Sequence, residues 1–223
     1  MTFYNIGHTN NISIIGGYPQ TERTKRLGYH VEDFNSERKV NANILPDFEP
    51  NFGLDLNEKS NETDIIDRGT LEFGLVVSAK LKSILSRYNL PPHKFYPIDV
   101  YNAKNKYYWF HYITDFEFFF DLKKSEIEIF DIFKQEVVDI VKFNSFKELT
   151  DYNRQLVLKI GKTMRYKSIK LNSNFPKFDL FEIKGAKHFT LITKTLKDEL
   201  EAQKITGLEY LEYNKIETTP TVV

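Results

Sequence analysis

The feature that most restricts the fold is a run of seven residues, Tyr107–Ile113, in which every side chain except His111 is aromatic or aliphatic. A strand with one face in solvent alternates apolar and polar residues, so a run without alternation predicts a strand that is covered on both faces. The chain can supply the covering layers, because it has 19 Phe, 13 Tyr and one Trp among 223 residues, and large rings bring much apolar area per side chain. We therefore expect a folded protein with a buried sheet, in which His111 is a hydrogen-bonded core histidine.

Other elements are predicted from caps and from periodicity. Ser78 can accept a hydrogen bond from the free N–H groups of the next turn, which predicts an amphipathic helix directly after it and before Pro91. Ser145, with Glu148 three residues later, fits a capping box and predicts a helix around Phe146–Lys162. Strands are expected at Leu71–Val77, Phe95–Tyr101, Tyr166–Leu171 and Phe178–Ile183, with short strands at Asn11–Ile15 and Val137–Phe143.

Two further patterns concern strand pairing. Apolar residues alternate with others along Phe116–Leu122 and again up to Ile129, and the polar turn Lys123–Ser125 separates the two segments, which predicts a β-hairpin. Pro97 lies inside a predicted strand, and because proline cannot donate a backbone hydrogen bond, it indicates an edge or an end there.

Residues 18–63 are polar and irregular, with Pro19, Pro46 and Pro50 and little periodicity. A stretch that buries little apolar area cannot offset the entropy lost on ordering it, so we expect a long loop or mobile arm outside the core. Loops of this length are often functional. The expected division is residues 1–63, an irregular strand and arm, and residues 64–223, an α+β domain.

Partner contacts are expected on this arm and on the loop after the first predicted helix. Aromatic side chains are frequent at the energetic centres of interfaces. The candidate partner-binding residues are Tyr18, Tyr29, Phe34, Pro92 and His93.

The C-terminal part repeats an earlier pattern. Leu191–Leu200 aligns with Val76–Leu85, and Ile205–Tyr210 aligns with Leu90–Phe95. In both places a strand, a Ser or Thr cap, an amphipathic helix, a breaker and a strand follow one another; coincidence between two ordinary helices is the alternative. The expected fold class is α+β, with a central, largely antiparallel sheet flanked by two pseudo-repeated strand-helix-strand units.

The charges are balanced. Lys plus Arg and Asp plus Glu each number 31, so no net field attracts nucleic acid or an anionic membrane. The N-terminus shows no signal-peptide pattern, and no window approaches the roughly 18 apolar residues that cross a bilayer. Without cysteine the chain suits a reducing compartment. We expect a cytoplasmic protein that binds neither nucleic acid nor membrane.

Motifs for catalysis are weak. Gly16-Gly17 lacks the spacing of phosphate-binding loops, the five histidines form no close metal-binding pair, and there is no thiol nucleophile. We expect no catalytic centre, no cofactor and no metal site. One enzymatic alternative stays open, because Asp99, Asp121 and Lys123 resemble the acidic pair and lysine that some nucleases use with Mg²⁺.

Several segments carry a resemblance to a known family. They are Gly74–Lys82, Leu90–Pro97, Phe178–Phe181, Ile192–Lys197 and Ile205–Leu208. Over roughly residues 64–215 the chain resembles a bacterial family that was first described as a domain of unknown function and is classed with the immunity proteins of polymorphic toxin systems. Here Thr193 replaces the commoner serine and Lys194 the commoner glutamate; threonine is also a good cap.

The resemblance implies a cytoplasmic protein that binds and neutralises a cognate bacterial toxin by occlusion, without catalysis. It names neither the toxin's activity nor the contact residues, because a shared fold does not fix function. The alternatives are the Mg²⁺-dependent nuclease and an adaptor that binds a protein unrelated to toxins.

Overall fold

The computed structural model describes residues 2–158 and 160–217. They form a mixed α+β protein with five α-helices and fourteen strands in three mostly antiparallel sheets. The chain divides into two compact units. The first unit holds the described residues within 1–5, 115–194 and 211–223, and the second holds 6–114 and 195–210. None of the helices described is long and apolar enough to span a membrane.

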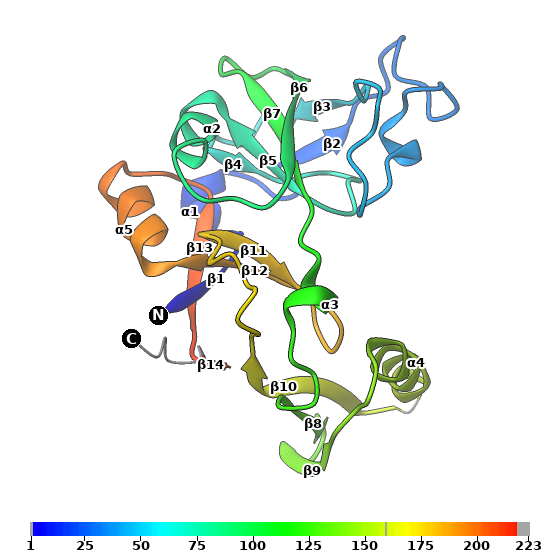
Figure 1. Cartoon of the computed structure of the whole chain (residues 1–223). Coiled ribbons are helices and arrows are strands. Elements are labelled where there is room, and N and C mark those ends of the chain that lie inside the picture. The colour runs from blue at the N-terminus through cyan, green and yellow to red at the C-terminus, as the bar shows by residue number, and fades with distance from the viewer. Residues whose placement is uncertain (1, 159, 218–223) are drawn as a thin grey trace. The chain divides into compact units, whose positions relative to one another are not determined.

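The second unit contains a six-stranded sheet in the order β2-β3-β6-β7-β5-β4 (Figure 1). Neighbouring strands are antiparallel except β3 and β6, which run parallel. The strands are β2 (Thr21–Arg23), β3 (Gly53–Leu56), β4 (Ile65–Ile66), β5 (Leu75–Ser78), β6 (His93–Tyr101) and β7 (Tyr107–Tyr112).

Strand β7 lies between β5 and β6 and is buried, as the run without alternation predicts. Trp109 packs on one face in a cluster that includes Phe52 and Leu71. On the other face, Lys82 of helix α2 (Ala79–Leu85) lies 3.8 Å from the ring centroid of Tyr108. His111 is fully buried, and its Nε2 lies 3.2 Å from the carbonyl oxygen of Ala42, so the expected core histidine is confirmed.

Helix α2 begins where the sequence predicts. The Oγ of Ser78 accepts a hydrogen bond from the N–H of Leu81 at 3.1 Å. The strand before it is shorter than expected, starting at Leu75 rather than Leu71. Gly74 explains this: its φ is +75°, and a Cβ there would lie 2.6 Å from the carbonyl oxygen of Phe110, so only glycine fits and the strand cannot extend through it.

The expectation of a loop or arm outside the core for residues 18–63 is wrong. The segment contains β2, β3 and a 3₁₀ turn, η1 (Glu37–Lys39), and its Val40, Phe52 and Leu54 are buried in the cluster around Trp109. These residues share no single helical or strand period because they reach the core from different elements, Val40 at the end of η1 and Leu54 in β3. Residues 6–63 also belong to the same compact unit as residues 64–114, so no boundary between the units falls at residue 63.

The N-terminal strand also differs from expectation. Residues Ile12–Ile15 form a short helix, α1, whose cap Asn11 accepts a hydrogen bond from the N–H of Ser13. The strand lies earlier, as β1 (Phe3–His8). Asparagine is a favoured N-cap, so the local signal for a helical turn competes with the apolar alternation.

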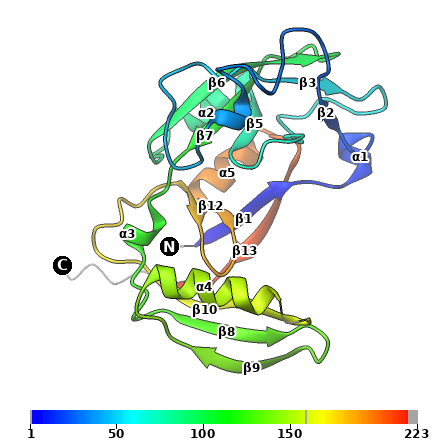
Figure 2. The same ribbon diagram turned by 90° about the vertical axis from the view of Figure 1, so that its right-hand side faces the viewer.

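The first unit contains the sheet β14-β10-β8-β9, of which Figure 2 shows β10, β8 and β9. Strands β1 and β13 of the sheet β11-β12-β1-β13 have residues in both units. Strand β10 contains all but the last residue of the strand expected at Tyr166–Leu171. Strand β11 begins two residues later than the strand expected at Phe178–Ile183. The remaining bounds are β8 (Glu126–Asp131), β9 (Glu136–Val141), β10 (Lys162–Lys170), β11 (Leu180–Ile183), β12 (Phe189–Thr193), β13 (Leu208–Tyr213), β14 (Ile216–Glu217), α3 (Phe116–Phe119), α4 (Phe146–Val157) and α5 (Lys194–Ala202).

The hairpin predicted from Phe116 to Ile129 is wrong. Asp115 caps helix α3, and the rings of Phe116 and Phe120 stack with centroids 4.9 Å apart. A four-residue spacing brings two side chains to one side of a helical turn, so the apolar pattern also suits a helix here. Strand β8 pairs instead with β9 and β10.

The second predicted cap is confirmed. The Oγ of Ser145 accepts from the N–H of Glu148 at 3.1 Å, and α4 starts at the next residue, Phe146. The Glu148 carboxylate accepts from the N–H of Asn144 at 2.9 Å, one residue before the usual partner of a capping box.

Truncating a residue of the 18–63 segment tests its place in the core. We expect Leu54→Ala, at a fully buried site, to lower the free energy of unfolding by about 3 kcal/mol, since it leaves a cavity. The matched control is Ile44→Ala, at a side chain that is 61% exposed, which should change stability by less than about 0.5 kcal/mol. Chemical denaturation measures both; equal, small losses would show that the segment is not core.

Candidate interaction surface

The sheet of the second unit splits beside Pro97. Strand β6 pairs with β7 over residues 93–98, but with β3 only from Asp99 onwards. Proline has no backbone N–H, so this stretch of strand has fewer donors to offer a neighbour. The edge that Pro97 indicates is therefore local: β6 pairs only with β7 at Pro97, and only with β3 from Asp99 onwards.

The split leaves a hollow of about 350 Å³, which we call the Pro97 hollow. Residues 97–99 of β6 line one side of it, and residues 49–52 with Asn35 line the other. Its walls are apolar at Phe52 and Ile98 and carry the carboxylates of Glu49 and Asp99.

Asp99 is held by an aromatic pair. The hydroxyl of Tyr29 donates a short hydrogen bond to the Asp99 carboxylate and lies 3.2 Å from the hydroxyl of Tyr101. Burial, the hydrogen bond to Asp99 and that to Tyr101 raise the pKa of Tyr29 well above its usual value, so its hydroxyl stays a donor to higher pH than that of an ordinary tyrosine. The guanidinium of Arg26 covers the Tyr101 ring at 4.1 Å and its Nε is 3.3 Å from Asp55.

Two turns beside the hollow expose large apolar side chains. Asn51 holds both turns, because its side-chain amide donates to the carbonyl of Gly28 and its backbone N–H donates to the carbonyl of Asn35 at 2.8 Å. The residues just before these anchors are Leu27 and Phe34, which are 91% and 79% exposed. The structure thus holds two apolar side chains in solvent on fixed backbone.

The surface around the hollow is acidic. Residues 29–58 include seven acidic side chains and two basic ones. Glu37 and Asp55 are paired with arginines, and the salt bridges found in the described part of the chain do not include Glu49 or Asp99. The two basic side chains in this range are Arg38 and Lys39, and the Nζ of Lys39 donates to the carbonyl of Glu32 at 2.7 Å.

The five candidate contact residues lie in three places. Tyr29 and Phe34 both flank the Pro97 hollow. Tyr18 is exposed at the turn that contains the cis Tyr18–Pro19 bond. Pro92 and His93 are at the start of β6, about 20 Å along the strand from Asp99, and the Nδ1 of His93 is 2.9 Å from the carbonyl of Pro91.

The sequence gives little sign of the other members of this surface. Arg26, Leu27 and Glu49 have no periodic pattern around them, and the sequence indicates Asp99 only as a possible metal ligand. Their shared position depends on the two anchors at Asn51, which are contacts between residues more than ten positions apart.

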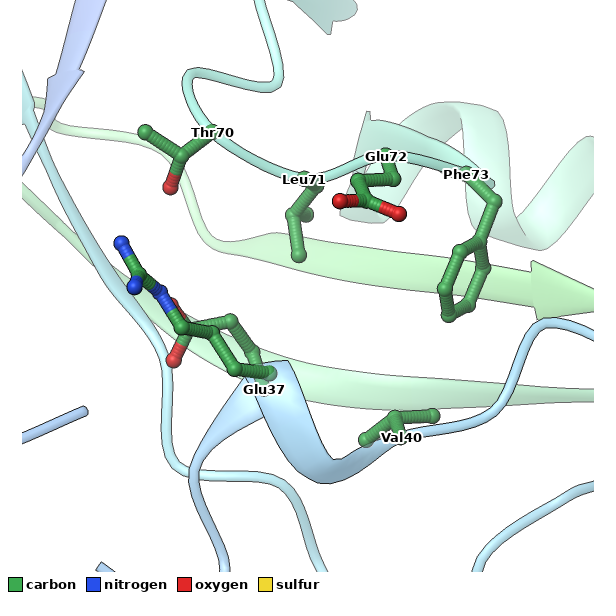
Figure 3. Close-up of a pocket in the computed structure, with 7 residues that line it drawn as sticks. Glu37, Val40, Thr70, Leu71, Glu72 and Phe73 are labelled. Carbon is green, nitrogen blue, oxygen red and sulfur yellow. The ribbon is translucent and has the colours of Figure 1, made fainter. Parts of the chain in front are cut away.

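A second pocket, of about 460 Å³, lies between η1 and the segment Thr70–Phe73 (Figure 3). Figure 3 shows Glu37 and Val40 on one side and Leu71, Glu72 and Phe73 on the other. The ring of Phe73 lies 4.9 Å from that of His111 and 5.3 Å from that of Trp109, so this wall continues the core.

Glu37, which lines this pocket, belongs to an ion pair with Arg23. The Nε of Arg23 lies 2.7 Å from a carboxylate oxygen of Glu37, and Arg23 also donates to the carbonyl of Tyr29 at 3.0 Å. Burial alone would raise the pKa of Glu37, but the hydrogen bonds and charge of Arg23 hold it below its usual value. The pair therefore joins β2 to η1 and to the turn that carries Tyr29.

The residues of the nuclease alternative are separate. Asp99 belongs to the second unit and bonds Tyr29, whereas Asp121 and Lys123 belong to the first, where Asp121 pairs with Lys124 at 2.9 Å. Neither unit by itself contains both carboxylates. Within the residues described there is no group of three or more His, Asp or Glu side chains placed to hold a metal ion.

Comparisons with protein-family models and with curated proteins give no match for this chain.

Breaking the buried ion pair should destabilise the second unit. We expect Glu37→Gln to lower the free energy of unfolding by about 3 kcal/mol at neutral pH, because it leaves Arg23 buried without its charge partner. The folded-state pKa of Glu37 is lowered, so its contribution is present above the ordinary carboxyl range and is lost as pH falls through the folded value.

The difference between wild type and Glu37→Gln should accordingly shrink towards acid pH, which denaturation at several pH values measures. The control is the double variant Arg23→Met with Glu37→Leu, which removes both charges and should cost less than Glu37→Gln. A loss that is independent of pH would contradict the assignment.

Proposed function

We propose that this chain is an immunity protein that binds a cognate bacterial toxin and neutralises it by occlusion, with no chemistry of its own. The observation that carries the proposal is the pair of exposed apolar side chains, Leu27 and Phe34, held on anchored turns beside an acidic hollow. The resemblance of residues 64–215 to the immunity family supplies the class of partner.

The cost of exposing these side chains supports a contact role. Leaving a leucine and a phenylalanine in water forgoes about 1.5–3 kcal/mol each compared with burial. Both turns are fixed by Asn51, so binding would cost little additional ordering entropy. Preorganised aromatic and apolar side chains with polar neighbours are what a protein interface uses for its central contacts.

The charge of the surface indicates the partner's charge. Glu49 and Asp99 present carboxylates over apolar walls at Phe52 and Ile98, a combination that suits the aliphatic stem and cationic head of an arginine or lysine. We therefore propose that the toxin presents basic side chains to this surface.

Most of the proposed surface, between residues 26 and 52, lies outside the region of family resemblance. The part with the resemblance, residues 64–215, includes the strands β6 and β7 against which the surface is built. We propose that the shared part supplies the scaffold and that the N-terminal segment supplies recognition of one particular toxin. Binding and neutralisation would take place in the cytoplasm, without nucleic acid or membrane.

The direct test is co-expression with the toxin domain encoded beside this chain, scoring host survival and co-purification. Survival with a stable complex would support immunity by binding. Survival without a complex would indicate an enzymatic antidote, and no survival would leave an adaptor for an unrelated protein as the better proposal.

The surface itself can be tested by substitution. We expect the double variant Leu27→Ser with Phe34→Ser to weaken toxin binding at least a hundredfold, because each is an exposed apolar contact, while the melting temperature changes little. Isothermal titration calorimetry and thermal denaturation measure the two effects. Ile44→Ser is the matched control, exposed in the same segment, and wild-type affinity in the double variant would exclude this surface.

Binding should also depend on salt. Opposite charges accelerate association at low ionic strength, so raising NaCl from 50 to 500 mM should slow association by about tenfold or more. The variant Glu49→Gln with Asp99→Asn should show a weaker dependence. Stopped-flow or surface-plasmon measurements of the association rate check this, and an equal salt dependence in both proteins would exclude an acidic contact.

We further propose that the pseudo-repeat is a genuine duplication. Supporting it, Ser78 donates its hydroxyl to the Asp64 carboxylate at 2.7 Å and its N–H to the Asp64 carbonyl at 2.8 Å. Thr193 makes the same two bonds to Asp179, at 2.8 and 2.9 Å. In each case the two residues bracket an antiparallel strand pair, β4–β5 or β11–β12, that leads into a helix, α2 or α5, and then a strand.

A further inference from the structure

Strand β9 is the free edge of the sheet β14-β10-β8-β9 in the first unit (Figure 2). Among the strands described it pairs with β8 alone, in an antiparallel arrangement. A free edge has backbone donors and acceptors that a further strand can bond, so an edge is where association by strand addition occurs.

The edge is apolar and open. Val137, Val138 and Ile140 of β9 are each 40–46% exposed. Phe133, in the turn between β8 and β9, is also exposed. Monomeric proteins usually place charges along such an edge, so three exposed aliphatic residues there indicate an interaction surface.

The order of charges in β9 identifies a partner. Glu136 begins the strand and Lys142 follows its last residue, with Asp139 midway between them. When two such strands run antiparallel about a two-fold axis at Asp139, Glu136 of each meets Lys142 of the other, and Val138 meets Ile140. We propose that β9 pairs in this way with β9 of a second copy of this chain.

Asp139 sets the strength of this pairing. Its carboxylate accepts the backbone N–H of Ile140 at 2.8 Å, so that N–H is occupied by a side chain of its own strand. The β8–β9 register also shifts between Ile129 and Phe130, which leaves Val138 as a bulge residue. In the pair, two Asp139 carboxylates would face each other across the axis, and like charges placed opposite are destabilising. Wild type therefore associates weakly, and removing this charge strengthens the dimer.

Sedimentation velocity of the full chain over a concentration series tests the proposal. Asp139→Asn should raise the dimerisation constant about tenfold or more over wild type, since it removes the facing charges and keeps an acceptor for Ile140. In the Asp139→Asn background, Glu136→Lys or Lys142→Glu alone should abolish the gain, because each creates two like-charged contacts. Both substitutions together should restore it.

Lys123→Glu is the matched control: it reverses an exposed charge in the same unit outside the paired stretch and should leave the dimer unchanged. Thermal denaturation of each variant separates loss of dimer from loss of fold. If Asp139→Asn sediments with the wild-type constant, the edge does not pair with a second copy. Failure of the charge exchange to restore a dimer in folded protein would also overturn the antiparallel arrangement about Asp139.

Discussion

The second unit depends on one constraint: a strand, β7, that cannot present either face to water. Trp109 and His111 occupy one face, and Tyr108 and Phe110 alternate with them on the other. Helix α2 covers the second of these faces, and the chain between residues 40 and 73 covers the first. An N-terminal segment with no period of its own is thereby ordered, because its scattered apolar residues complete the core.

Polar side chains of that segment are also held in fixed positions, by an ion pair and by hydrogen bonds. The Arg23–Glu37 pair is buried, so each charge needs the other, and Arg23 also bonds the carbonyl of Tyr29. Tyr29 in turn bonds Asp99 of β6. A continuous chain of contacts therefore runs from the pocket under η1 to the hollow beside Pro97, and the turn with Tyr29 has bonds at both ends.

Local signals in the sequence predicted local structure well. The caps at Ser78 and Ser145, the buried run of β7 and the core position of His111 follow from a few neighbouring residues, and the structure has all of them. Pairing between distant segments was not predictable in this way. The parallel contact of β3 with β6 and the pairing of β8 with β10 depend on which surfaces the folded chain brings together.

The same division applies to the candidate surface. Tyr29 and Phe34 could be chosen from sequence as aromatic residues in a polar segment, whereas Leu27, Glu49 and the hollow could not, because their position is set by hydrogen bonds across the segment. Gly74 shows the converse case. This single residue with positive φ makes β5 start at Leu75, whereas the apolar pattern alone predicts a start at Leu71.

Asn51 anchors both exposed turns through two different groups, its side-chain amide and its backbone N–H. The positions of Leu27 and Phe34 therefore share one hinge point, and substitutions at the two sites should not have additive effects on recognition. We expect a change of binding specificity to need replacements on both turns, because a bulkier residue on one turn displaces Asn51 and with it the backbone of the other turn. The asparagine makes two separate loops behave as one recognition unit.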